Sequence, residues 1–365
     1  MRKKSTAVSK WIAALVVGFF IVGMAMTVSA KETMWRMTST WPPSINLIEA
    51  DQLFVKYVNE LCKGKLQIKF FSGGTLMPAQ EVFDAVSKGS IQASGDWPNY
   101  WSGKDIAFDT LGSYPMGLTP VDYMVWIYQG GGLAIYQEIY GKYGLMYFPT
   151  GVTPSESGIR SNKPVKTAAD LKGMKVRMGG KAQGYILKEL GAAQVVLSGA
   201  EVYQALQKGT VDGAEFSGPS TDWKMGLGEV SKYWIAPGFH QPASVMGVMI
   251  NKAAWDALDK ETQSLVQAAS KVAFLEFITK QYWDSIEGTK NFLDKGIQLN
   301  KIDAETLDKI EKIVNKYTEE TAAASPLFKK AIESQNNYRK ALSTWRNIEE
   351  PFNFGYNPKE YPNIK

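Results

Sequence analysis

Residues 202–216 read VYQALQKGTVDGAEF, and residues 82–96 read VFDAVSKGSIQASGD. Each stretch has the pattern of a helix that ends at Lys-Gly and is followed by a short strand, since glycine commonly follows the last helical residue. The two copies lie 120 residues apart (202 − 82). They predict two lobes of related construction, each of which directs one strand end toward a shared cleft. A chance match is the alternative, because Lys-Gly is common at helix ends.

Strand and helix patterns alternate around the first copy. A strand pattern at 35–39 ends in the proline turn TWPPS, and a helix is expected from about Ser44, a good N-cap, to Gly64. Residues 65–71, KLQIKFF, alternate apolar and polar side chains as a half-buried strand does. Alternation of this kind predicts an α/β fold with ligands at the carboxyl ends of the strands.

The same order of elements restarts in the second half of the chain. The expected elements are a short helix capped by Thr167, a strand at 175–178, helices at 185–192 and 202–208, and a strand at 210–215. We therefore expect two lobes. Lobe I comprises residues 31–150 with about 243–282, and lobe II comprises residues 151–242 with about 283–365.

The last quarter of the chain is helical in pattern. Its longest helix has side chains at alternating steps of three and four, namely Leu265, Ala268, Val272, Leu275, Thr279, Tyr282 and Ile286. We interpret this face as packing across the back of both lobes. The alternative is that part of it contacts a second subunit in a homodimer. Further helices are expected at 304–317 and 326–347.

The N-terminus has the pattern of a secretory signal, with basic residues before an apolar run at 11–26 and small residues up to Ala30. Cleavage after Ala30 would release the protein into the periplasm. An uncleaved anchor is the alternative, although the run is shorter than the roughly 20 residues that span a bilayer. The first 30 residues hold four of the 41 Lys and Arg. The remaining chain is nearly neutral, and no nucleic-acid partner is expected.

Residues for catalysis are scarce. His240 is the only histidine and Cys62 the only cysteine, so no histidine- or cysteine-rich metal motif can form. We expect His240 to be a packed or cleft-rim residue, Cys62 to be a small buried hydrophobe, and the protein not to be an enzyme.

Arg177 and Glu215 are the polar residues that stand out. Arg177 lies inside the strand pattern KVRM and Glu215 ends the strand of the second copy, so each needs a partner if it is buried. The planar fork of donors on Arg177 matches a ligand carboxylate. The structural alternative is an ion pair with Asp170 or Glu215, and a cation would also serve as the partner of Glu215.

Several segments, in this order, resemble the extracytoplasmic solute receptors of tripartite ATP-independent periplasmic (TRAP) transporters: GGGLAIYQEIYGKYGL, PVKTAADLKGMKVRMGG, EVYQALQKGTVDGAEFSGP and WIAPGFHQPASVMGVMINKAAWDAL. YWSGKD at 100–105 is similar to the branch that binds 2-oxoacids and lactate. The resemblance implies a two-lobed α/β periplasmic-binding-protein fold, type II-like, with a long C-terminal helical segment across both lobes. It also implies a receptor that closes on an organic acid and delivers it to an ion-gradient-driven permease.

The resemblance extends to the site. In those receptors the arginine of the KVR strand binds the substrate carboxylate, and Arg177 matches it. In the 2-oxoacid branch a cation is held by a Gln, the Glu that ends the repeat strand, the carbonyl of the next aromatic residue, and a second Glu. Glu215 and Phe216 match two of these positions, while Glu156 stands at the Gln position and Gln241 at the second Glu position. This exchange keeps two carboxylates, which suits Na⁺ or Ca²⁺; the alternative is that the cation site is lost and Glu156 is a solvated loop acid.

Trp41 and Tyr100 are expected to line the cleft; the alternative is that they are packed core residues. Phe216 replaces a Trp that is usual in the branch and Asn99 adds an amide, which suggests a roomier or more polar pocket. The expected ligand is a small 2-oxo or 2-hydroxy monocarboxylate, with no organic cofactor. Two other functional classes stay open. One is a periplasmic ligand sensor that docks on a receptor kinase, and the other is a metal-dependent periplasmic enzyme with Glu215 as its base, against which the lack of histidines argues.

Overall fold

The computed structural model describes residues 32–349, so the predicted signal segment lies outside the described residues. The first sheet has the strand order β2-β1-β3-β10-β4. Its strands are β1 (Thr33–Thr38), β2 (Leu66–Phe70), β3 (Ala93–Asp96), β4 (Leu145–Val152) and β10 (Val245–Asn251). β1 runs parallel to β2 and β3, whereas β10 runs antiparallel to β3 and β4. The chain therefore returns to this sheet after it has built most of a second one.

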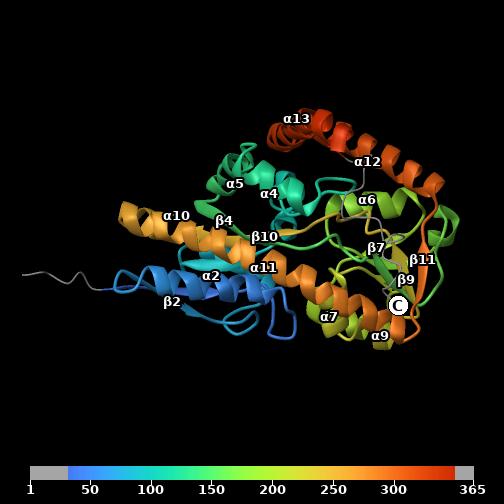
Figure 1. The fold of residues 1–365 in the computed structure, drawn as a ribbon, viewed down its shortest axis with the longest axis horizontal. Coiled ribbons are helices and arrows are strands. Elements are labelled where there is room, and N and C mark those ends of the chain that lie inside the picture. Colours follow the sequence, from blue (N-terminus) through green and yellow to red (C-terminus); the bar gives the residue numbers. More distant parts are fainter. Residues whose placement is uncertain (1–31, 350–365) are drawn as a thin grey trace, which may run out of the picture.

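The second sheet has the strand order β11-β9-β5-β8-β6-β7. Its strands are β5 (Ile159–Ser161), β6 (Lys175–Arg177), β7 (Ala193–Val195), β8 (Gly213–Ala214), β9 (Tyr233–Ala236) and β11 (Gln298–Lys301). Figure 1 shows the first sheet in the left half of the molecule and the second sheet in the right half. The α/β class predicted from the sequence is confirmed. We assign the first sheet to lobe I and the second to lobe II, and the exact lobe boundaries stay a proposal.

Each repeated stretch forms a helix followed by a strand, as predicted. α3 (Val82–Ser87) leads to β3, and α7 (Gly199–Gln207) leads to β8. Each of these strands pairs with a parallel neighbour, β1 or β6. Trp97, directly after β3, and Glu215, directly after β8, are the nearest side chains to the position of an added Cβ on Gly179. The ends of the two copies therefore meet between the lobes.

Helices cover both sheets. The remaining short and medium helices are α2 (Ile48–Leu61), α4 (Pro120–Tyr128), α5 (Gly132–Gly141), α6 (Lys181–Glu189), α8 (Pro219–Lys224), α9 (Leu227–Val230) and α10 (Lys252–Asp256). Phe54 and Val58 of α2 are buried in one core cluster with Cys62, which is a buried free thiol as expected. Within residues 32–349, no helix has the length and hydropathy needed to cross a membrane.

The long helix α11 (Lys260–Asp294) packs on α2, β4 and α8 and so touches both lobes (Figure 1). The face that it buries is not the predicted one. Val266, Ala273 and Phe277 are fully buried, whereas Val272 and Leu275 of the predicted face are 42% and 60% exposed. The prediction was wrong because apolar residues occur on both faces of this helix. Spacing alone cannot tell which of two apolar faces meets the core.

The two last helices are α12 (Ala304–Ala324) and α13 (Pro326–Glu349), close to the predicted bounds. α12 packs on α6, and α13 packs on α5 and on the 3-10 helix η3 (Ile106–Thr110). The chain therefore crosses from lobe II back to lobe I at its end, as Figure 1 shows at the top of the molecule.

The lobes are in contact with one another. One core cluster includes Val152 of β4 together with Val176 and Met178 around β6. Asp109 of η3 accepts hydrogen bonds from the backbone N–H groups of Lys181 at 3.0 Å and Ala182 at 2.9 Å, in the first turn of α6. A lobe I carboxylate thus caps a lobe II helix, where the exposed N–H groups and the helix dipole favour negative charge. The two lobes are therefore in direct contact in the described conformation.

Candidate functional site

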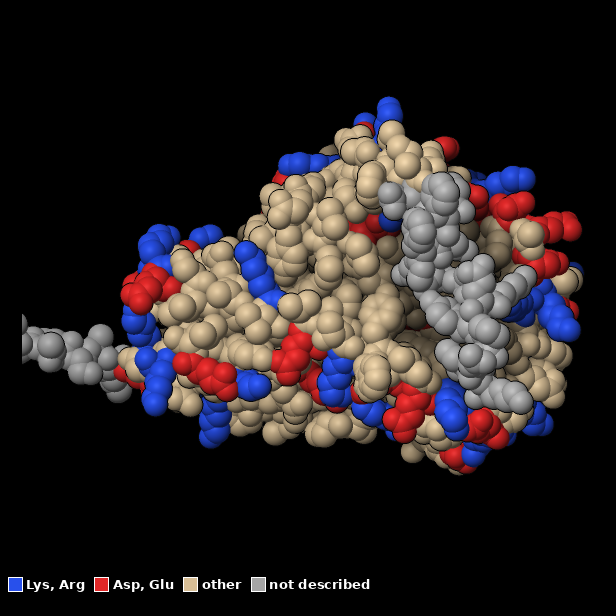
Figure 2. Space-filling view, viewed as in Figure 1, with Lys and Arg blue, Asp and Glu red and all other residues tan. Residues whose placement is uncertain are grey.

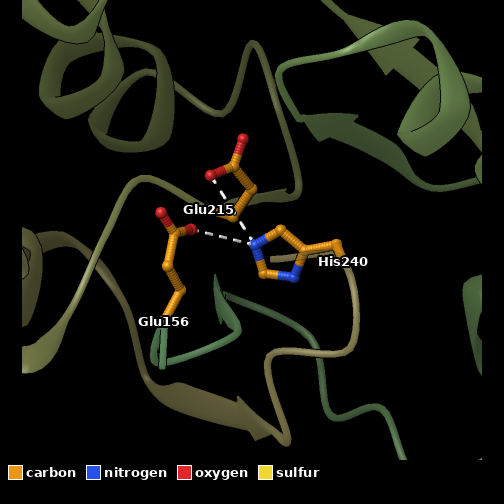
Figure 3. Close-up of side chains that lie close together, drawn as sticks. All are labelled: Glu156, Glu215 and His240. Carbon is orange, nitrogen blue, oxygen red and sulfur yellow. Dashed lines mark hydrogen bonds and ion pairs between the residues drawn. The ribbon is translucent and has the colours of Figure 1, made fainter. Parts of the chain in front are cut away.

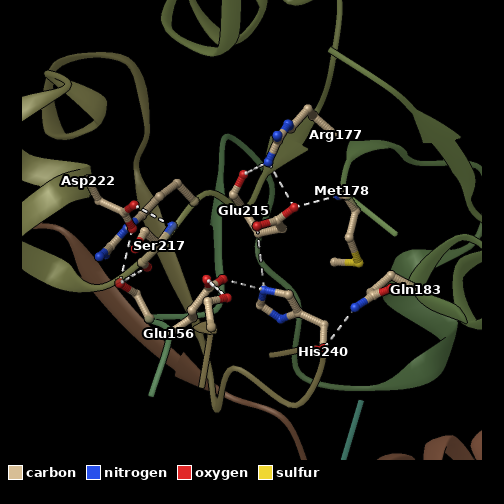
Figure 4. A network of polar contacts seen from close by, with 12 residues as sticks. Glu156, Arg177, Met178, Gln183, Glu215, Ser217, Asp222 and His240 are labelled. Carbon is tan, nitrogen blue, oxygen red and sulfur yellow. Dashed lines mark hydrogen bonds and ion pairs between the residues drawn. The ribbon is translucent and has the colours of Figure 1, made fainter. Parts of the chain in front are cut away.

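Arg177 and Glu215 meet because β6 and β8 are parallel neighbours, with Arg177 opposite Ala214. Arg177 Nη1 donates to Glu215 Oε1 at 2.8 Å and to the Glu215 carbonyl at 2.7 Å (Figure 4). Nε and Nη2 both donate to the Leu197 carbonyl at 3.2 Å. These bonds use four of the five guanidinium N–H groups. Arg177 therefore forms the ion pair that the sequence left open, and one N–H on Nη2 has no acceptor among the described residues.

Two loops bring further polar groups to Glu215. Glu156 lies between β4 and β5, and His240 follows β9. His240 Nε2 lies 3.3 Å from Glu156 Oε2 and 3.7 Å from Glu215 Oε2, so one ring nitrogen faces both carboxylates (Figure 3). Ser244 Oγ donates to Glu156 Oε1 at 2.9 Å, and the Gly179 N–H donates to Glu215 Oε1 at 2.6 Å.

Gln241 completes this group, which we call the anchor cluster: Glu156, Arg177, Glu215, His240 and Gln241. With its nitrogen toward the carboxylates, the Gln241 amide donates to Glu156 Oε2 at 2.6 Å and to Glu215 Oε2 at 3.1 Å. Turned by half a rotation, the same amide would present its oxygen at that place. All five side chains are buried. The alternative that Glu156 is a solvated loop acid is wrong, because the residue is only 5% exposed.

Burial and charge shift the acid–base behaviour of the cluster. Burial raises the pKa of Glu156 to about 7. Burial alone would lower the pKa of His240, but the hydrogen bonds and charges of Glu156 and Glu215 outweigh it and raise that pKa to about 9. Burial would raise the pKa of Glu215, but the charges of Arg177 and His240 and the hydrogen bonds from His240 and the Gly179 N–H together outweigh it and hold that pKa below its ordinary value. When Glu156 and Glu215 are both ionised, the positive charges of Arg177 and protonated His240 therefore balance their two negative charges.

The donor set fits a hard cation. One carboxylate oxygen of Glu156 and one of Glu215 lie within 4.8 Å of each other and of a ring nitrogen of His240, which can ligate a metal only after it loses its proton. Carboxylate and amide oxygens are the ligands that Na⁺ and Ca²⁺ prefer. Glu156, Glu215 and Gln241, the predicted side-chain ligands, thus converge on one place. The predicted role of the Phe216 carbonyl stays a prediction.

Aromatic side chains wall this part of the cleft. The Phe216 ring lies 5.2 Å from the Arg177 guanidinium carbon, a cation–π arrangement. Tyr100 packs edge-on against Trp97, with ring centroids 4.9 Å apart. Trp41 is buried nearby and, with Tyr100, lines a cavity between the lobes. Trp97, directly after β3, was absent from the predicted site residues.

Asn99 does not share in this wall. Its amide nitrogen donates to the carbonyls of Asp109 and Ser113, and its oxygen accepts from the N–H groups of Gly112 and Ser113. These bonds hold the loop around η3 and occupy the whole amide. A ligand contact would have to break them, so we leave Asn99 out of the proposed site.

His240 is the member of the cluster that sequence reasoning missed. We predicted a packed or rim residue, and its side chain is indeed fully buried. Its position directly before Gln241 was the available signal, because a neighbour of a predicted ligand lies near the same site. The sequence could not show that the ring points at both carboxylates.

The chain matches a known family. The model described as "Bacterial extracellular solute-binding protein, family 7" matches residues 37–325. The monocarboxylate 2-oxoacid-binding periplasmic protein of Nostoc sp. strain PCC 7120 is 33% identical over 318 residues, which cover 87% of this chain and 86% of that protein. The similarity therefore extends through both lobes.

Solved structures resemble the whole fold. A TRAP periplasmic solute-binding protein from Colwellia psychrerythraea, with bound calcium and pyruvate, has a TM-score of 0.84 and 28% identity, covering 88% of this chain and 98% of that one. Another from Pseudoalteromonas atlantica, with bound sodium and pyruvate, has a TM-score of 0.83 and 29% identity, covering 88% of this chain and 98% of that one.

Proposed function

Because the chain belongs to family 7 of the bacterial extracellular solute-binding proteins, we propose that it binds a small 2-oxo or 2-hydroxy monocarboxylate between its lobes, assisted by a cation, and serves as the receptor of a TRAP transporter. The observation that carries the proposal is the anchor cluster, in which Arg177, His240 and two carboxylates converge between the lobes. The relatives that contain pyruvate with calcium or sodium support both the ligand class and the cation.

The chemistry of the cluster suits an anionic ligand. Arg177 would donate its remaining N–H to the ligand carboxylate. Glu156, Glu215, the Gln241 oxygen and the Phe216 carbonyl would hold the cation, which when bound supplies positive charge beside the ligand. Closure of the lobes excludes water from these charges, and their attraction is stronger at low effective dielectric. The ligand is therefore held most firmly in the closed conformation.

Calorimetric titration of the purified protein tests this function. The ligands are pyruvate, lactate, longer 2-oxo acids, C4-dicarboxylates and sialic acid, each in calcium buffer, in EDTA and in sodium-free buffer, because chelators barely capture sodium. We expect a monocarboxylate to bind and to bind more weakly once both cations are removed. Tight binding of a C4-dicarboxylate, unchanged by either removal, would refute the ligand class and the cation together.

Location and partner follow from the same proposal. We propose that a cleaved signal directs the protein to the periplasm, where the relative from Nostoc is also placed by its name. The permease subunits of a TRAP transporter would be its membrane partner. Cell fractionation of a tagged full-length chain tests the location, and recovery of an uncleaved protein in the membrane fraction contradicts it.

We also propose a homodimer formed through α11. The predicted apolar face of this helix is exposed, and its large side chains are Val272, Leu275, Tyr282 and Ile286, with Trp283 beside them. Figure 2 shows an area near the middle of this view where no Lys, Arg, Asp or Glu is coloured; tan there marks all uncharged residues, polar as well as apolar. Exposed apolar areas of this kind are typical of protein contacts. Light scattering should give a dimer for the wild type and a monomer for Leu275→Glu; a monomeric wild type at high micromolar concentration refutes the dimer.

Two rival functions make different predictions. A metal-dependent enzyme would convert its ligand, so recovery of unchanged pyruvate after long incubation argues for a receptor. A sensor that docks on a receptor kinase would bind the same ligand but support no uptake. Loss of ligand uptake on deletion of the gene, restored by the wild-type chain, therefore separates the receptor from the sensor.

A further inference from the structure

A second buried ion pair lies in lobe II, outside the anchor cluster. Arg160 of β5 and Asp222 of α8 are both fully buried, and Arg160 Nε donates to Asp222 Oδ2 at 2.9 Å. The guanidinium carbon of Arg160 lies 4.1 Å from the centre of the Trp234 ring and 3.7 Å from the centre of the Phe292 ring. The two Nη atoms have no hydrogen-bond acceptor among the described residues. Because removing two charges from water offsets most of their attraction, stability alone does not account for this pair.

The Asp222 carboxylate also binds the two chain segments that carry the predicted cation ligands. Its Oδ1 accepts from the Ser217 N–H at 3.1 Å (Figure 4), and its Oδ2 accepts from the Ser157 hydroxyl at 3.0 Å. Ser157 directly follows Glu156, and Ser217 directly follows Phe216. Asp222 therefore holds the neighbour of a predicted ligand in each segment. Among the described residues, none of its side-chain hydrogen bonds is to the anchor cluster itself.

Further hydrogen bonds fix the segment that carries Glu156. The Ser157 N–H donates to the Ser217 carbonyl at 3.0 Å, and the Ser157 carbonyl accepts from Trp234 Nε1. The Glu156 N–H donates to the Gln241 carbonyl at 3.2 Å. The backbone beside Glu156 is therefore tied to the segment that follows β8, and the bond between the Ser157 hydroxyl and the buried carboxylate is part of that link.

We propose that Asp222, held by Arg160, is a positioning residue of the cation site, which fixes the distance between the oxygen ligands that the two segments supply. This inference rests on the proposed function and adds a residue to its site. A hard cation is bound strongly only when several oxygens converge on it, so segments that can move apart bind it more weakly. Arg177 is held by Glu215 and Leu197 and not by this pair, so it should still bind the ligand carboxylate when Asp222 is replaced.

The test is calorimetric titration of Asp222→Asn with pyruvate at a series of free calcium concentrations, in sodium-free buffer. The calcium concentration that gives half of the full effect reports cation binding, and the pyruvate affinity at saturating calcium reports the rest of the site. We expect the half-effect concentration to rise roughly tenfold or more, as is typical when a residue that supports metal ligands is replaced. The affinity at saturating calcium should match that of the wild type.

The possible failures have different meanings. An unchanged half-effect concentration in Asp222→Asn overturns the inference and leaves the proposed function intact, as does a loss of affinity that saturating calcium does not restore. A wild type whose pyruvate binding depends on neither calcium nor sodium refutes the cation-assisted function and this inference with it.

Asp122→Asn is the matched control. Asp122 is a buried carboxylate of α4 that pairs with Arg346, so each variant removes one charge from an ion pair with a buried acid. We expect both variants to lose stability in urea unfolding and only Asp222→Asn to need more calcium. An equal shift of the calcium dependence in Asp122→Asn overturns the positioning role.

A double variant keeps the inference testable if Asp222→Asn fails to fold. Arg160→Met combined with Asp222→Leu removes both charges, and replacement of a buried ion pair by apolar residues of similar volume is often neutral for stability. Ser157 and Ser217 still lose this acceptor, so the double variant should also need roughly tenfold more calcium. In the ligand-free protein, hydrogen exchange of the Ser217 N–H, measured by mass spectrometry, should become faster. Either a wild-type calcium dependence or an unchanged exchange rate in the double variant overturns the inference.

Discussion

Replacing Arg177 with alanine tests the anchor cluster directly. Arg177 is 4% exposed, and its guanidinium makes four hydrogen bonds to Glu215 and Leu197. The substitution leaves the Glu215 carboxylate buried with His240 as its remaining cationic neighbour. Loss of one partner from a buried charge pair costs about 3–5 kcal/mol, and loss of a buried charged contact to a ligand costs at least ~2 kcal/mol, or roughly 30-fold in affinity.

The assay separates these two effects. Urea unfolding followed by tryptophan fluorescence gives the stability of the variant, and calorimetry with pyruvate below the unfolding transition gives the affinity of the folded protein. Arg346→Ala is the matched control, because it removes an ion pair with the buried Asp122 in α4. We expect both variants to lose stability and only Arg177→Ala to lose affinity. Unchanged pyruvate affinity in Arg177→Ala, or an equal loss in Arg346→Ala, would refute the role of Arg177.

Three further predictions concern the acids around the cleft. Burial raises the pKa of Asp96 to about 7, so the folded state keeps a proton that the unfolded state releases near pH 4, and this acid lowers the free energy of unfolding as the pH rises from 4 to 7. Burial also raises the pKa values of Glu156 and Asp109, so urea titrations of Asp96→Asn should show a shallower slope than the wild type. Asp109→Ala should speed ligand release in stopped-flow measurements by roughly fivefold or more, since it removes the cap from α6, whereas Asp259→Ala, which uncaps α11, should not. Glu156→Gln should weaken calcium binding roughly tenfold or more in calorimetry, and an unchanged calcium affinity would place the cation elsewhere.

The architecture could be predicted because local signals repeat. Each copy of the repeated unit carries its own helix stop and its own strand, so two α/β lobes followed from residues that act over short distances. The contact between Arg177 and Glu215 could also be predicted, since both residues lie at the ends of strands in one predicted lobe. β6 and β8 are parallel neighbours in the second sheet, and this pairing brings the two residues together.

Contacts between distant loops could not be predicted in the same way. Glu156 and His240 lie 84 residues apart, and their contact depends on how two loops fold over the ends of the second sheet. The buried face of α11 was missed for a related reason. Both of its faces are apolar, and only the packing of α2, β4 and α8 decides which one is covered. Asn99 is the opposite case. The sequence suggested a ligand-binding role for this polar residue, but its amide forms hydrogen bonds only with backbone groups of the loop around η3.

The balanced charges of the anchor cluster bear on what each loaded receptor carries to the membrane. When both acids are ionised, Arg177 and His240 cancel Glu156 and Glu215, so the cluster itself is electrically neutral. A monocarboxylate accompanied by Na⁺ keeps that neutrality, whereas one accompanied by Ca²⁺ adds a single positive charge. Loss of the proton from His240 would cancel this added positive charge. On the proposed function, the net charge of the loaded receptor therefore depends on which cation it holds and on whether His240 is protonated.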